Sequence, residues 1–436
     1  MIGAGIGGLL AARVMSEFFV DVTVVEHDIL PDDASLRRRI PQGAHAHALL
    51  GRGLNSLEEL FPGFTREMVD HGASIGDALT DFRIVFDDHF VAHSTSGIQV
   101  ITASRSLLEW RLRNRVESID NVEIIDRCAA VDIIVNPHSR AVAGLAVSRG
   151  SGAVEVIAAD MIVDASGRGS QTQSWLEKRG FPRPRKVELN IQLGYATRHF
   201  RRESAHLEGD LAVLVGARPN NPRAGSISAQ EGDRWVVTLG GYFHDAPPMD
   251  PSGFYEFAAT LGVPALTEIL TTAMPLDEEA ARYRIPAAVR RFYDADDLPE
   301  GYIPLGDTVC CFNPIYAQGM SVAAAEAIFL RQCLHRSTSG LTRRYLRKIT
   351  TIVDVAWAVA STADLRLPCV EGARTRRGRI ATAYICRIYA AAAADPYVGA
   401  AFGRVTNLVA HPATLISPRM LFRVWRGSRR SAESAS

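Results

Sequence analysis

The chain has 436 residues and a mass of 47.5 kDa, which is too long for one small core and predicts two or three domains. Hydrophobic residues make up 47% and charged residues 22%, which argues against disorder, collagen-like repeats or a coiled coil as the main state. The 48 basic and 48 acidic side chains leave no net charge, so nothing in the composition points to nucleic acid as a partner.

The basic residues are almost all arginine, because only Lys178, Lys186 and Lys348 are lysine. Codon usage in a GC-rich genome explains such a bias, so an arginine cluster alone predicts no site. The six cysteines contain no CxxC pair, which favours a reduced, cytoplasmic protein with cysteines as small core residues. No signal-peptide pattern opens the chain, and no uncharged apolar run reaches about 18 residues.

A glycine-rich turn opens the chain and leads into a helix and a strand. Gly3, Gly5 and Gly8 have the spacing GxGxxG, the helix covers about residues 5–17, and a β-branched strand ends at Glu26. The glycines allow a pyrophosphate to approach the helix N-terminus, and Glu26 is placed to accept hydrogen bonds from an adenosine ribose. These elements predict a dinucleotide site, and the acidic residue favours FAD or NAD over NADP.

One element of this fingerprint is short. A strand is needed before Gly3, and only Met1 and Ile2 are there. A Rossmann sheet without its central first strand is incomplete, which predicts further residues upstream of Met1. The alternative is a shortened strand that the fold tolerates.

Further elements alternate along the chain. A helix is expected from Ala46 to Leu60, and a second strong helix from Arg105 to Val116. The other expected elements are strands around 82–86, 90–93 and 99–102, a meander over 122–147, a strand and glycine turn at 161–170, strands over 188–242, mixed helix and turn over 251–274, a short strand at 301–307, and helices through 321–334 and 340–436.

A second motif lies some 300 residues after the first. Gly306-Asp307 ends a short strand, and Pro314 and Gln318-Gly319-Met320 lead into a helix. Together with the glycine turn and Glu26, this pattern resembles the class A flavoprotein monooxygenases, which have the p-hydroxybenzoate hydroxylase fold. The resemblance implies that Asp307 binds the ribityl chain of FAD. It also implies that the backbone at Gly319 and Met320 faces the flavin pyrimidine ring, where a helix N-terminus stabilises negative charge.

Two further segments match the same family. Arg105, at the start of its helix, would contact FAD near the phosphates or the ribityl chain. The alternative is an ordinary helix cap by Ser104 with Arg105 in solvent. Asp164 matches a family segment associated with FAD and NAD(P)H, but Ala165 stands where glycine is usual. Direct use of NAD(P)H is therefore less secure than FAD binding.

The segment 37–50 looks closest to actinobacterial natural-product monooxygenases, including the polyene epoxidases of polyether antibiotics. In that comparison His45 and His47 lie beside FAD, and a polar helix entry is the equally good alternative. The two histidines lack partners for zinc, so no metal site is expected. Flavin-dependent halogenases are disfavoured, because no lysine precedes Lys178 and no two tryptophans are two residues apart.

The motifs and the resemblance give two sets of candidates, with no catalytic side chain assigned. The candidate cofactor-binding residues are Gly3, Gly5, Ile6, Gly7, Gly8, Glu26, His45, His47, Arg105, Ala130, Asp164, Gly306, Asp307, Pro314, Gln318, Gly319 and Met320. The candidate substrate residues, taken from the sheet and the flavin-side loop, are Asn190, Gln192, Tyr195 and Tyr316.

The predicted fold is α/β, with a Rossmann-like FAD-binding domain, a mostly antiparallel β-sheet substrate domain and a helical C-terminal region. The expected boundaries are 1–80, 98–186 and 299–335 for the FAD-binding domain, 81–97 and 187–298 for the sheet domain, and 336–436 for the helical region.

The resemblance implies an FAD-dependent monooxygenase. Reduced flavin would add O2 at C4a, and the hydroperoxide would pass one oxygen atom to a hydrophobic alkene, by epoxidation, or to an aromatic substrate. The narrower resemblance favours an alkene over a phenol, and no base positioned for a phenol is evident. NAD(P)H would serve as a transient reductant, or a partner flavin reductase would reduce the flavin. The alternatives are an FAD-dependent reductase or dehydrogenase of the geranylgeranyl reductase type, and a scaffold that no longer binds flavin.

Residues 366–387 and 419–430 are rich in arginine. Arg419, Arg423 and Arg426 recur on one helical face beside apolar residues, which is compatible with a helix lying on a membrane surface. Because of the arginine bias, a solvated helix face is the favoured interpretation.

Overall fold

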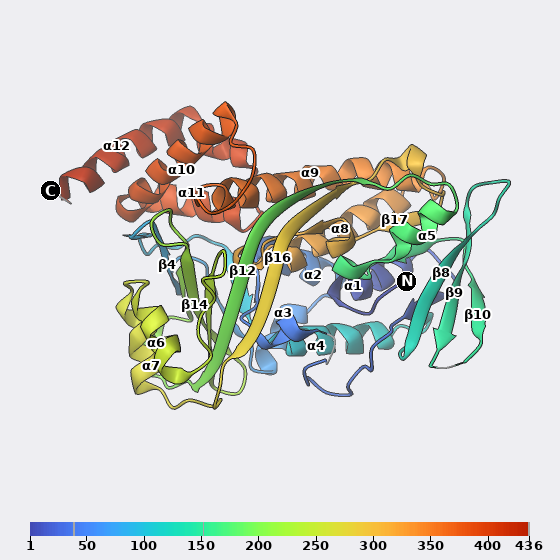
Figure 1. Ribbon diagram of the computed structural model, residues 1–436, viewed down its shortest axis with the longest axis horizontal. Coiled ribbons are helices and arrows are strands. Elements are labelled where there is room, and N and C mark those ends of the chain that lie inside the picture. The colour runs from blue at the N-terminus through green and yellow to red at the C-terminus, as the bar shows by residue number, and fades with distance from the viewer. Residues whose placement is uncertain (38–39, 151, 435–436) are drawn as a thin grey trace.

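A small parallel sheet lies at the centre of the computed structural model, which describes residues 1–37, 40–150 and 152–434 (Figure 1). Strand β1 (Val22–Val25) pairs with β7 (Val122–Ile125), and β11 (Ile162–Asp164) pairs with β17 (Tyr302–Pro304). Ile2 forms parallel bridges to both Val25 and Asp164 and so joins the two pairs. Ile2 therefore lies in the place of the first strand of this sheet.

Helices cover this parallel sheet. In helix α1 (Ile6–Met15) nearly every side chain is buried, as expected for a helix enclosed on all sides. It packs against α4 (Arg105–Glu117) and α8 (Gly319–Leu334), and α8 also contacts α2 (Gly51–Leu60) and α9 (Leu341–Asp364). The two remaining helices of this half are α3 (Phe64–Asp70) and α5 (Thr172–Lys178).

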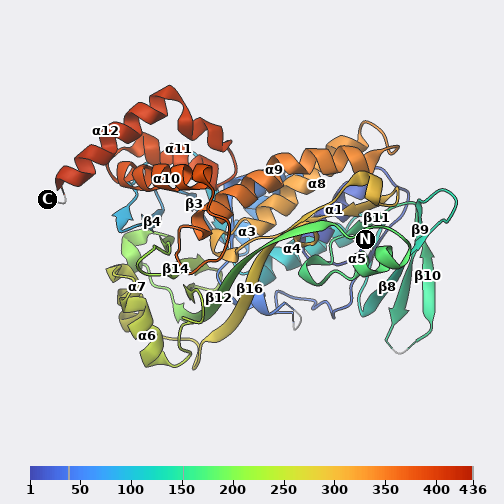
Figure 2. The same ribbon diagram turned by 45° about the horizontal axis from the view of Figure 1, so that its top comes forward.

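A second, larger sheet of eight strands crosses the molecule beside the parallel sheet (Figure 2). Two long strands, β12 (Arg185–Arg201) and β16 (Ala281–Phe292), pair antiparallel along most of their length. Only β13 and β4 pair in parallel, so the sheet is mostly antiparallel, as the sequence predicts. Its order is β18 (Cys310–Cys311), β16, β12, β15 (Arg234–Gly241), β14 (Arg223–Gln230), β13 (Ala212–Val215), β4 (Phe82–Phe86) and β5 (His89–Phe90).

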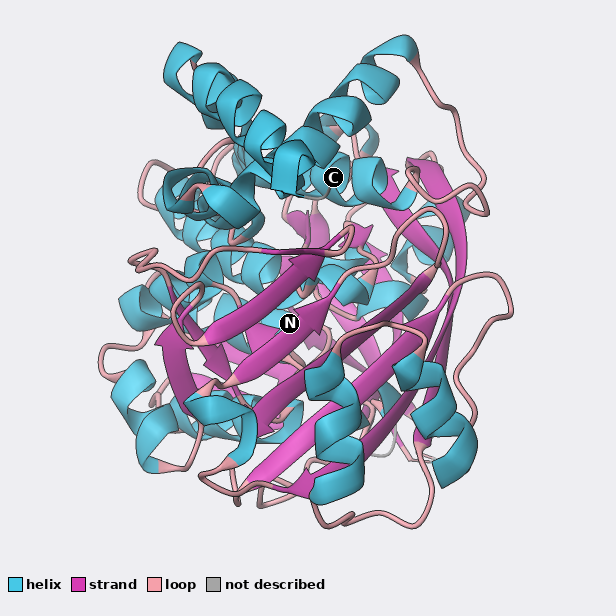
Figure 3. Ribbon diagram, turned by 90° about the vertical axis from the view of Figure 1, so that its left-hand side faces the viewer, coloured by secondary structure: helices cyan, strands magenta, loops and turns pink. Residues whose placement is uncertain are grey.

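The two faces of this sheet differ in chemistry, because successive side chains of a strand point to opposite faces. Trp235, Val237 and Leu239 belong to an apolar cluster with α6 (Pro251–Ala259) and α7 (Pro264–Thr272). Figure 3 shows helices crossing this outer face. Thr197 and Thr238, which are paired across β12 and β15, alternate with those residues and therefore face the parallel sheet.

Two small antiparallel sheets complete the strands. One contains β10 (Val154–Ala158), β9 (Val142–Arg149) and β8 (Cys128–Val135), and the other contains β2 (Ala48–Leu49), β6 (Gln99–Thr102) and β3 (Ser74–Asp77).

The prediction of a helix that begins at Ala46 is wrong for the first turn of that helix. Residues 48–49 pair with β6, and the helix begins at Gly51, because sheet hydrogen bonds replace the first turn.

The C-terminal region is helical, as predicted. After α9, the helices α10 (Arg376–Ala394), α11 (Pro396–Thr406) and α12 (Pro418–Ser434) form a layer at one end of the molecule (Figure 1). None of the described helices is long and apolar enough to cross a membrane. The predicted fold class is confirmed, whereas the domain boundaries stay a prediction.

Short 3-10 helices also occur along the chain. They are η1 (Pro41–Ala44), η2 (Gly167–Gly169), η3 (His206–Gly209), η4 (Ala295–Asp297), η5 (Gly306–Thr308), η6 (Pro314–Tyr316) and η7 (Pro412–Ile416).

Four of the six cysteines, Cys128, Cys310, Cys311 and Cys333, are buried as expected of core residues. Cys369 and Cys386 are only partly buried, so the core assignment is wrong for these two. Cys369 follows α9 and Cys386 lies in α10, so both are in the C-terminal region.

Candidate functional site

The glycine turn has the geometry of an anion-binding loop. Gly3 has a φ of +95°, and a Cβ at Gly8 would lie 1.8 Å from the Gly3 carbonyl oxygen, so neither position accepts another residue without rearrangement. A Cβ at Gly5, in contrast, would meet nothing within 4 Å. Open space therefore lies in front of the first turn of α1, where backbone N–H groups lack helical partners. This cradle fits a pyrophosphate.

Glu26 follows β1 and lies beside this loop, as the fingerprint predicts. Its carboxylate accepts hydrogen bonds from the Ala4 N–H at 2.7 Å and the Asp28 N–H at 2.8 Å. The Arg37 guanidinium also lies 3.0 Å from Glu26 Oε2. Ala130 is near the same place, because the Cys128 N–H at the start of β8 donates to the Glu26 carbonyl at 2.8 Å.

Asp307 lies at the matching edge of β17, about 300 positions away in sequence. A Cβ at Gly167 would be 3.7 Å from the Asp307 Cβ, and a Cβ at Gly319 would be 3.8 Å from Asp307 Oδ1. The Asp307 side chain is exposed, yet surrounding protein raises its pKa by desolvation, against the opposing effect of Arg168 and other arginines. The Asp307 carboxylate is therefore accessible and lies beside Gly167 and Gly319.

The two motifs come together through direct packing. A Cβ at Gly7 would be 3.0 Å from the Leu305 side chain, and one at Gly3 would be 2.8 Å from the Ala165 carbonyl oxygen. Parallel strands present their carboxyl ends at one edge, so Glu26 after β1 and Asp307 after β17 share that edge. The convergence that the sequence predicts is present.

Asp164 has a different geometry from the other candidates. Its carboxylate is completely buried and accepts hydrogen bonds from the Ser170 hydroxyl at 2.7 Å and the Tyr302 hydroxyl at 2.9 Å. It also binds the backbone N–H and the hydroxyl of Ser166. These bonds hold the loop after β11 against β17. The cofactor contact predicted for Asp164 remains a prediction, and the exposed residues of this segment are Ser166 and Gly169.

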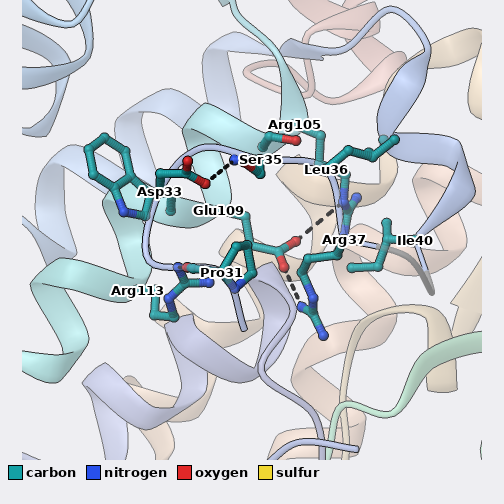
Figure 4. A pocket seen from close by; sticks show the side chains of 12 residues that line it. Pro31, Asp33, Ser35, Leu36, Arg37, Ile40, Arg105, Glu109 and Arg113 are labelled. Atoms are coloured by element: carbon teal, nitrogen blue, oxygen red, sulfur yellow. Dashed lines mark hydrogen bonds and ion pairs between the residues drawn. The ribbon is translucent and has the colours of Figure 1, made fainter. Parts of the chain in front are cut away.

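A pocket between the loop after Glu26 and the start of α4 is lined by Arg37, Arg105 and Arg113 (Figure 4). Glu109 lies between two of these, paired with Arg37 and, at 3.4 Å, with Arg105. Ser104 caps α4 by accepting from the Leu107 N–H at 3.1 Å, so the capping interpretation is confirmed. Arg105 is nevertheless mostly buried rather than in solvent. Arg38 and Arg39 of the preceding segment lie outside the described residues.

His45 and His47 lie between the two sheets. His45 is buried, its Nδ1 is 2.7 Å from Thr197 Oγ1, and its Nε2 has no hydrogen-bond partner in the described chain. Burial lowers the pKa of His45 to about 4, so the ring is neutral at pH 7. His47 Nδ1 lies 2.9 Å from the His45 carbonyl oxygen, and burial, with Arg105 nearby, lowers its pKa to about 3. Because Thr197 lies in β12, the hydrogen bond between His45 and Thr197 connects His45 directly to the large sheet.

The loop before α8 brings the predicted flavin-side residues next to Asp307. Pro314 is exposed in η6, and Gln318, Gly319 and Met320 begin α8. The Gln318 side chain is buried, and its Oε1 has no partner among the described residues. Because Gly319 begins this 16-residue helix close to Asp307, the positive dipole end of α8 lies beside the Asp307 carboxylate.

Glu326 is buried beneath this loop and was not found from the sequence. Its Oε2 accepts a hydrogen bond from the Gly306 N–H at 2.6 Å. Burial raises the pKa of Glu326 to about 8, so the carboxyl is mostly protonated at pH 7. A single glutamate in an apolar helix carries no sequence signal for this role.

A second buried carboxyl group, Asp364, ends α9. Its Oδ1 accepts hydrogen bonds from Tyr316 at 2.8 Å, Asn313 at 2.7 Å and Tyr242 at 3.1 Å. Its Oδ2 is buried without a partner among the described residues, and burial raises its pKa to about 6. The sequence analysis missed Asp364, because no motif surrounds it.

The four predicted substrate residues divide into two pairs. Tyr195 belongs to an apolar cluster of β12, β16 and the end of α9, and its ring centroid is 5.7 Å from that of His45. Tyr316 joins that cluster through Asp364. Asn190 and Gln192 bond each other at 2.9 Å, where the β12 register shifts. Tyr195 therefore lies in the apolar cluster and Tyr316 bonds to Asp364, whereas the substrate role of all four residues stays a prediction.

No group of three or more possible metal ligands occurs among the described residues.

Comparison with known sequences identifies one relative that covers most of the chain. Protein Rv3254 of Mycobacterium tuberculosis is 34% identical over 350 residues, which are 78% of this chain and 73% of the relative. This chain belongs to the family of Rv3254. No established protein-family model matches the sequence.

Comparison with solved structures shows the fold of flavin-dependent enzymes. The flavin-dependent brominase Bmp2 has a TM-score of 0.70 at 12% identity and covers 100% of this chain and 98% of its own. An oxygenase of 2-methyl-3-hydroxypyridine-5-carboxylic acid has a TM-score of 0.61 at 22% identity, with 84% and 90% covered. PqsL of Pseudomonas aeruginosa, a probable FAD-dependent monooxygenase, has a TM-score of 0.60 at 16% identity, with 84% and 96% covered. The fold of this Rv3254-family chain is thus that of flavin-dependent monooxygenases and halogenases.

Proposed function

We propose that this chain is an FAD-dependent monooxygenase that inserts one oxygen atom from dioxygen into a hydrophobic substrate. The observation that carries the proposal is the meeting of the Gly3–Gly8 loop with Asp307 at one edge of the parallel sheet. Bound FAD, once reduced, would supply the activated oxygen atom to an alkene or an aromatic ring. NAD(P)H, directly or through a flavin reductase, would supply the electrons.

Each half of the cradle would hold a different part of FAD. The open space at Gly5 would receive the pyrophosphate, and Glu26 would accept hydrogen bonds from the adenosine ribose. Asp307 would bind the ribityl chain. The N-terminus of α8 at Gly319 would face the flavin ring and stabilise negative charge there.

The substrate would bind between the parallel sheet and the inner face of the large sheet. Tyr195, Tyr242 and Ile285 belong to an apolar cluster that would exclude water from the reaction. His45 would remain neutral and bring no charge to this site.

Asp364 bears on the choice of substrate. Its unpartnered Oδ2 would accept a hydrogen bond from a hydroxyl or amine group of the substrate. A hydroxylated aromatic substrate therefore has more support than the sequence alone gave it, because the sequence showed no positioned base.

Oxygen incorporation tests the proposal. Purified protein, reconstituted with FAD and given NADPH or a flavin reductase system, would be incubated with candidate alkenes and phenols under isotopically labelled dioxygen. The proposal predicts product that carries one labelled oxygen atom. Product formed equally well without oxygen would instead support the reductase alternative, and halide-dependent product would support halogenation. A protein that stays colourless after FAD reconstitution would overturn the proposal.

A further inference from the structure

The charge of the chain is unevenly distributed along the sequence. Residues 371–436 contain eleven arginines and three acidic residues, an excess of eight positive charges, whereas the whole chain has no net charge. Residues 1–370 therefore carry an excess of eight negative charges. The preference for arginine over lysine explains why the basic residues are arginines. It does not explain why acidic residues are scarce in this region.

Helix α12 in this region has one buried and one exposed apolar face. Met420 and Val424 are buried, and a Cβ at Gly427 would lie 2.9 Å from the Ala391 side chain, so this face packs against α10. On the opposite face, Leu421, Phe422 and Trp425 are 46%, 59% and 50% exposed, and together they form the α12 patch. The last two rings lie 6.3 Å apart. The helix forms the outer end of the molecule (Figures 1 and 2).

Arginines border the α12 patch on one side. Arg419 and Arg426 are three residues before and four residues after Phe422, so they follow the same strip of the helix. They line a groove together with Phe422 and the start of α11. Neither has a carboxylate within ion-pair distance among the described residues, whereas Arg423 is paired with Asp395 at 2.7 Å. The Arg419 guanidinium lies over the Tyr397 ring at 4.4 Å, a contact that leaves its charge unneutralised, so positive charge lies beside the exposed rings.

We propose that the α12 patch binds the surface of an anionic phospholipid bilayer. Phe422 and Trp425 would enter the boundary between headgroups and acyl chains, as aromatic side chains do at interfaces, and Arg419 and Arg426 would pair with lipid phosphates. A second copy of the chain is a poorer occupant, because a twofold contact would bring two arginine-bordered faces together. The inference needs no bound flavin and is independent of the proposed function.

Vesicle sedimentation tests this inference on the full chain. The probes are vesicles of phosphatidylcholine alone and of phosphatidylcholine mixed with phosphatidylglycerol. The variants are Phe422→Ser with Trp425→Ser, and Arg419→Gln with Arg426→Gln. Val154→Ser is the matched control, because Val154 is 58% exposed on β10, in a different part of the fold. Circular dichroism would show that each variant is folded.

The wild type and Val154→Ser should sediment with the anionic vesicles and be released by high salt, because salt screens the charges. Binding by either double variant should fall at least about tenfold, since each removes contacts on the order of 1.4 kcal/mol or more. Failure of the wild type to bind anionic vesicles would overturn the proposal. Equal binding by wild type and variants would overturn it too. A wild-type dimer that both double variants convert to monomer would show that a second copy covers the patch instead.

Discussion

The Tyr316 hydroxyl donates a 2.8 Å hydrogen bond to Asp364 Oδ1 and thereby joins the flavin-side loop to the last residue of α9. Asn313 of the same loop donates to the same oxygen. The position of the loop before α8 therefore depends on a carboxyl group that is buried in the C-terminal half. The candidate cofactor edge and the candidate substrate region are one connected unit.

Tyr316→Phe tests this connection. The variant removes one of three donors to Asp364, whose pKa is about 6 in the folded protein. Donors favour the ionised carboxylate, so we expect a loss of about 1–2 kcal/mol in the free energy of unfolding at pH 8. The loss should be smaller at pH 5, where Asp364 is mostly protonated. Urea denaturation at both pH values measures it, and an equal loss at both would contradict the account.

Asp364→Asn should remove a pH dependence. Burial raises the folded pKa of Asp364 above its usual value of 3.8, so its stabilising effect is complete below pH 4 and is lost as pH rises through 6. The difference in unfolding free energy between variant and wild type should therefore change by roughly 3 kcal/mol between pH 4 and pH 7, in favour of the variant. A difference that stays constant over this range would contradict the pKa assignment.

Glu326 allows a matched pair of variants. Glu326→Gln keeps an acceptor for the Gly306 N–H and removes the titration, whereas Glu326→Ala removes both. The folded pKa of about 8 means that wild-type stability falls as pH rises from about 4.5 through 8. We expect the free energy of unfolding of the Gln variant to exceed that of the wild type by roughly 5 kcal/mol at pH 9. Near pH 4 the two proteins should be equally stable.

The Ala variant at the same position tests the loop. FAD affinity, measured by fluorescence titration, should stay near wild type for Glu326→Gln and fall for Glu326→Ala, because the turn at Gly306 and Asp307 loses its support. Equal affinity of both variants would show that Glu326 does not position that turn.

His45→Gln should alter the acid side of the stability curve. Burial lowers the folded pKa of His45 to about 4, so the stability that the neutral ring contributes is present above pH 6.5 and is lost as pH falls through 4. The wild type should lose roughly 3 kcal/mol more than the variant between pH 7 and pH 4. Thermal unfolding followed by circular dichroism across this range measures the difference. Parallel curves for the two proteins would place the pKa of His45 near its ordinary value.

Gly5→Val separates cofactor binding from folding. A Cβ at Gly5 would meet nothing within 4 Å, so we expect unchanged thermal stability and at least tenfold weaker FAD binding, about 1.4 kcal/mol or more. Gly378→Ala, on α10, is a control that should leave FAD binding unchanged. Gly8→Ala should instead destabilise the fold, because its Cβ would lie 1.8 Å from the Gly3 carbonyl oxygen. Normal FAD binding by Gly5→Val would place the cofactor elsewhere.

The sequence predicted the parts of this molecule that depend on local pattern. The glycine turn before α1 and Glu26 after β1 follow from chain geometry at a helix N-terminus and a strand end. Asp307 was found through the family resemblance, from its position some 300 residues after the glycine turn and before a helix. The mistake at 46–50 arose because Ala48 and Leu49 pair with β6, which is distant in sequence.

Asp364 and Glu326 could not be predicted in the same way. Each is one acidic residue in a helix, and only the packing of α8 and α9 against the sheets removes it from water. Their pKa values are therefore properties of tertiary contacts. The exposure of Phe422 likewise depends on which face of α12 packs against α10.

Crystallographic difference density after addition of FAD tests the central claim most directly. We expect one FAD molecule whose adenosine ribose contacts Glu26, whose pyrophosphate lies over Gly5 and whose ribityl chain contacts Asp307. FAD bound at a place that touches only one of the two motifs, or no FAD density in crystals of a folded protein, would contradict the account.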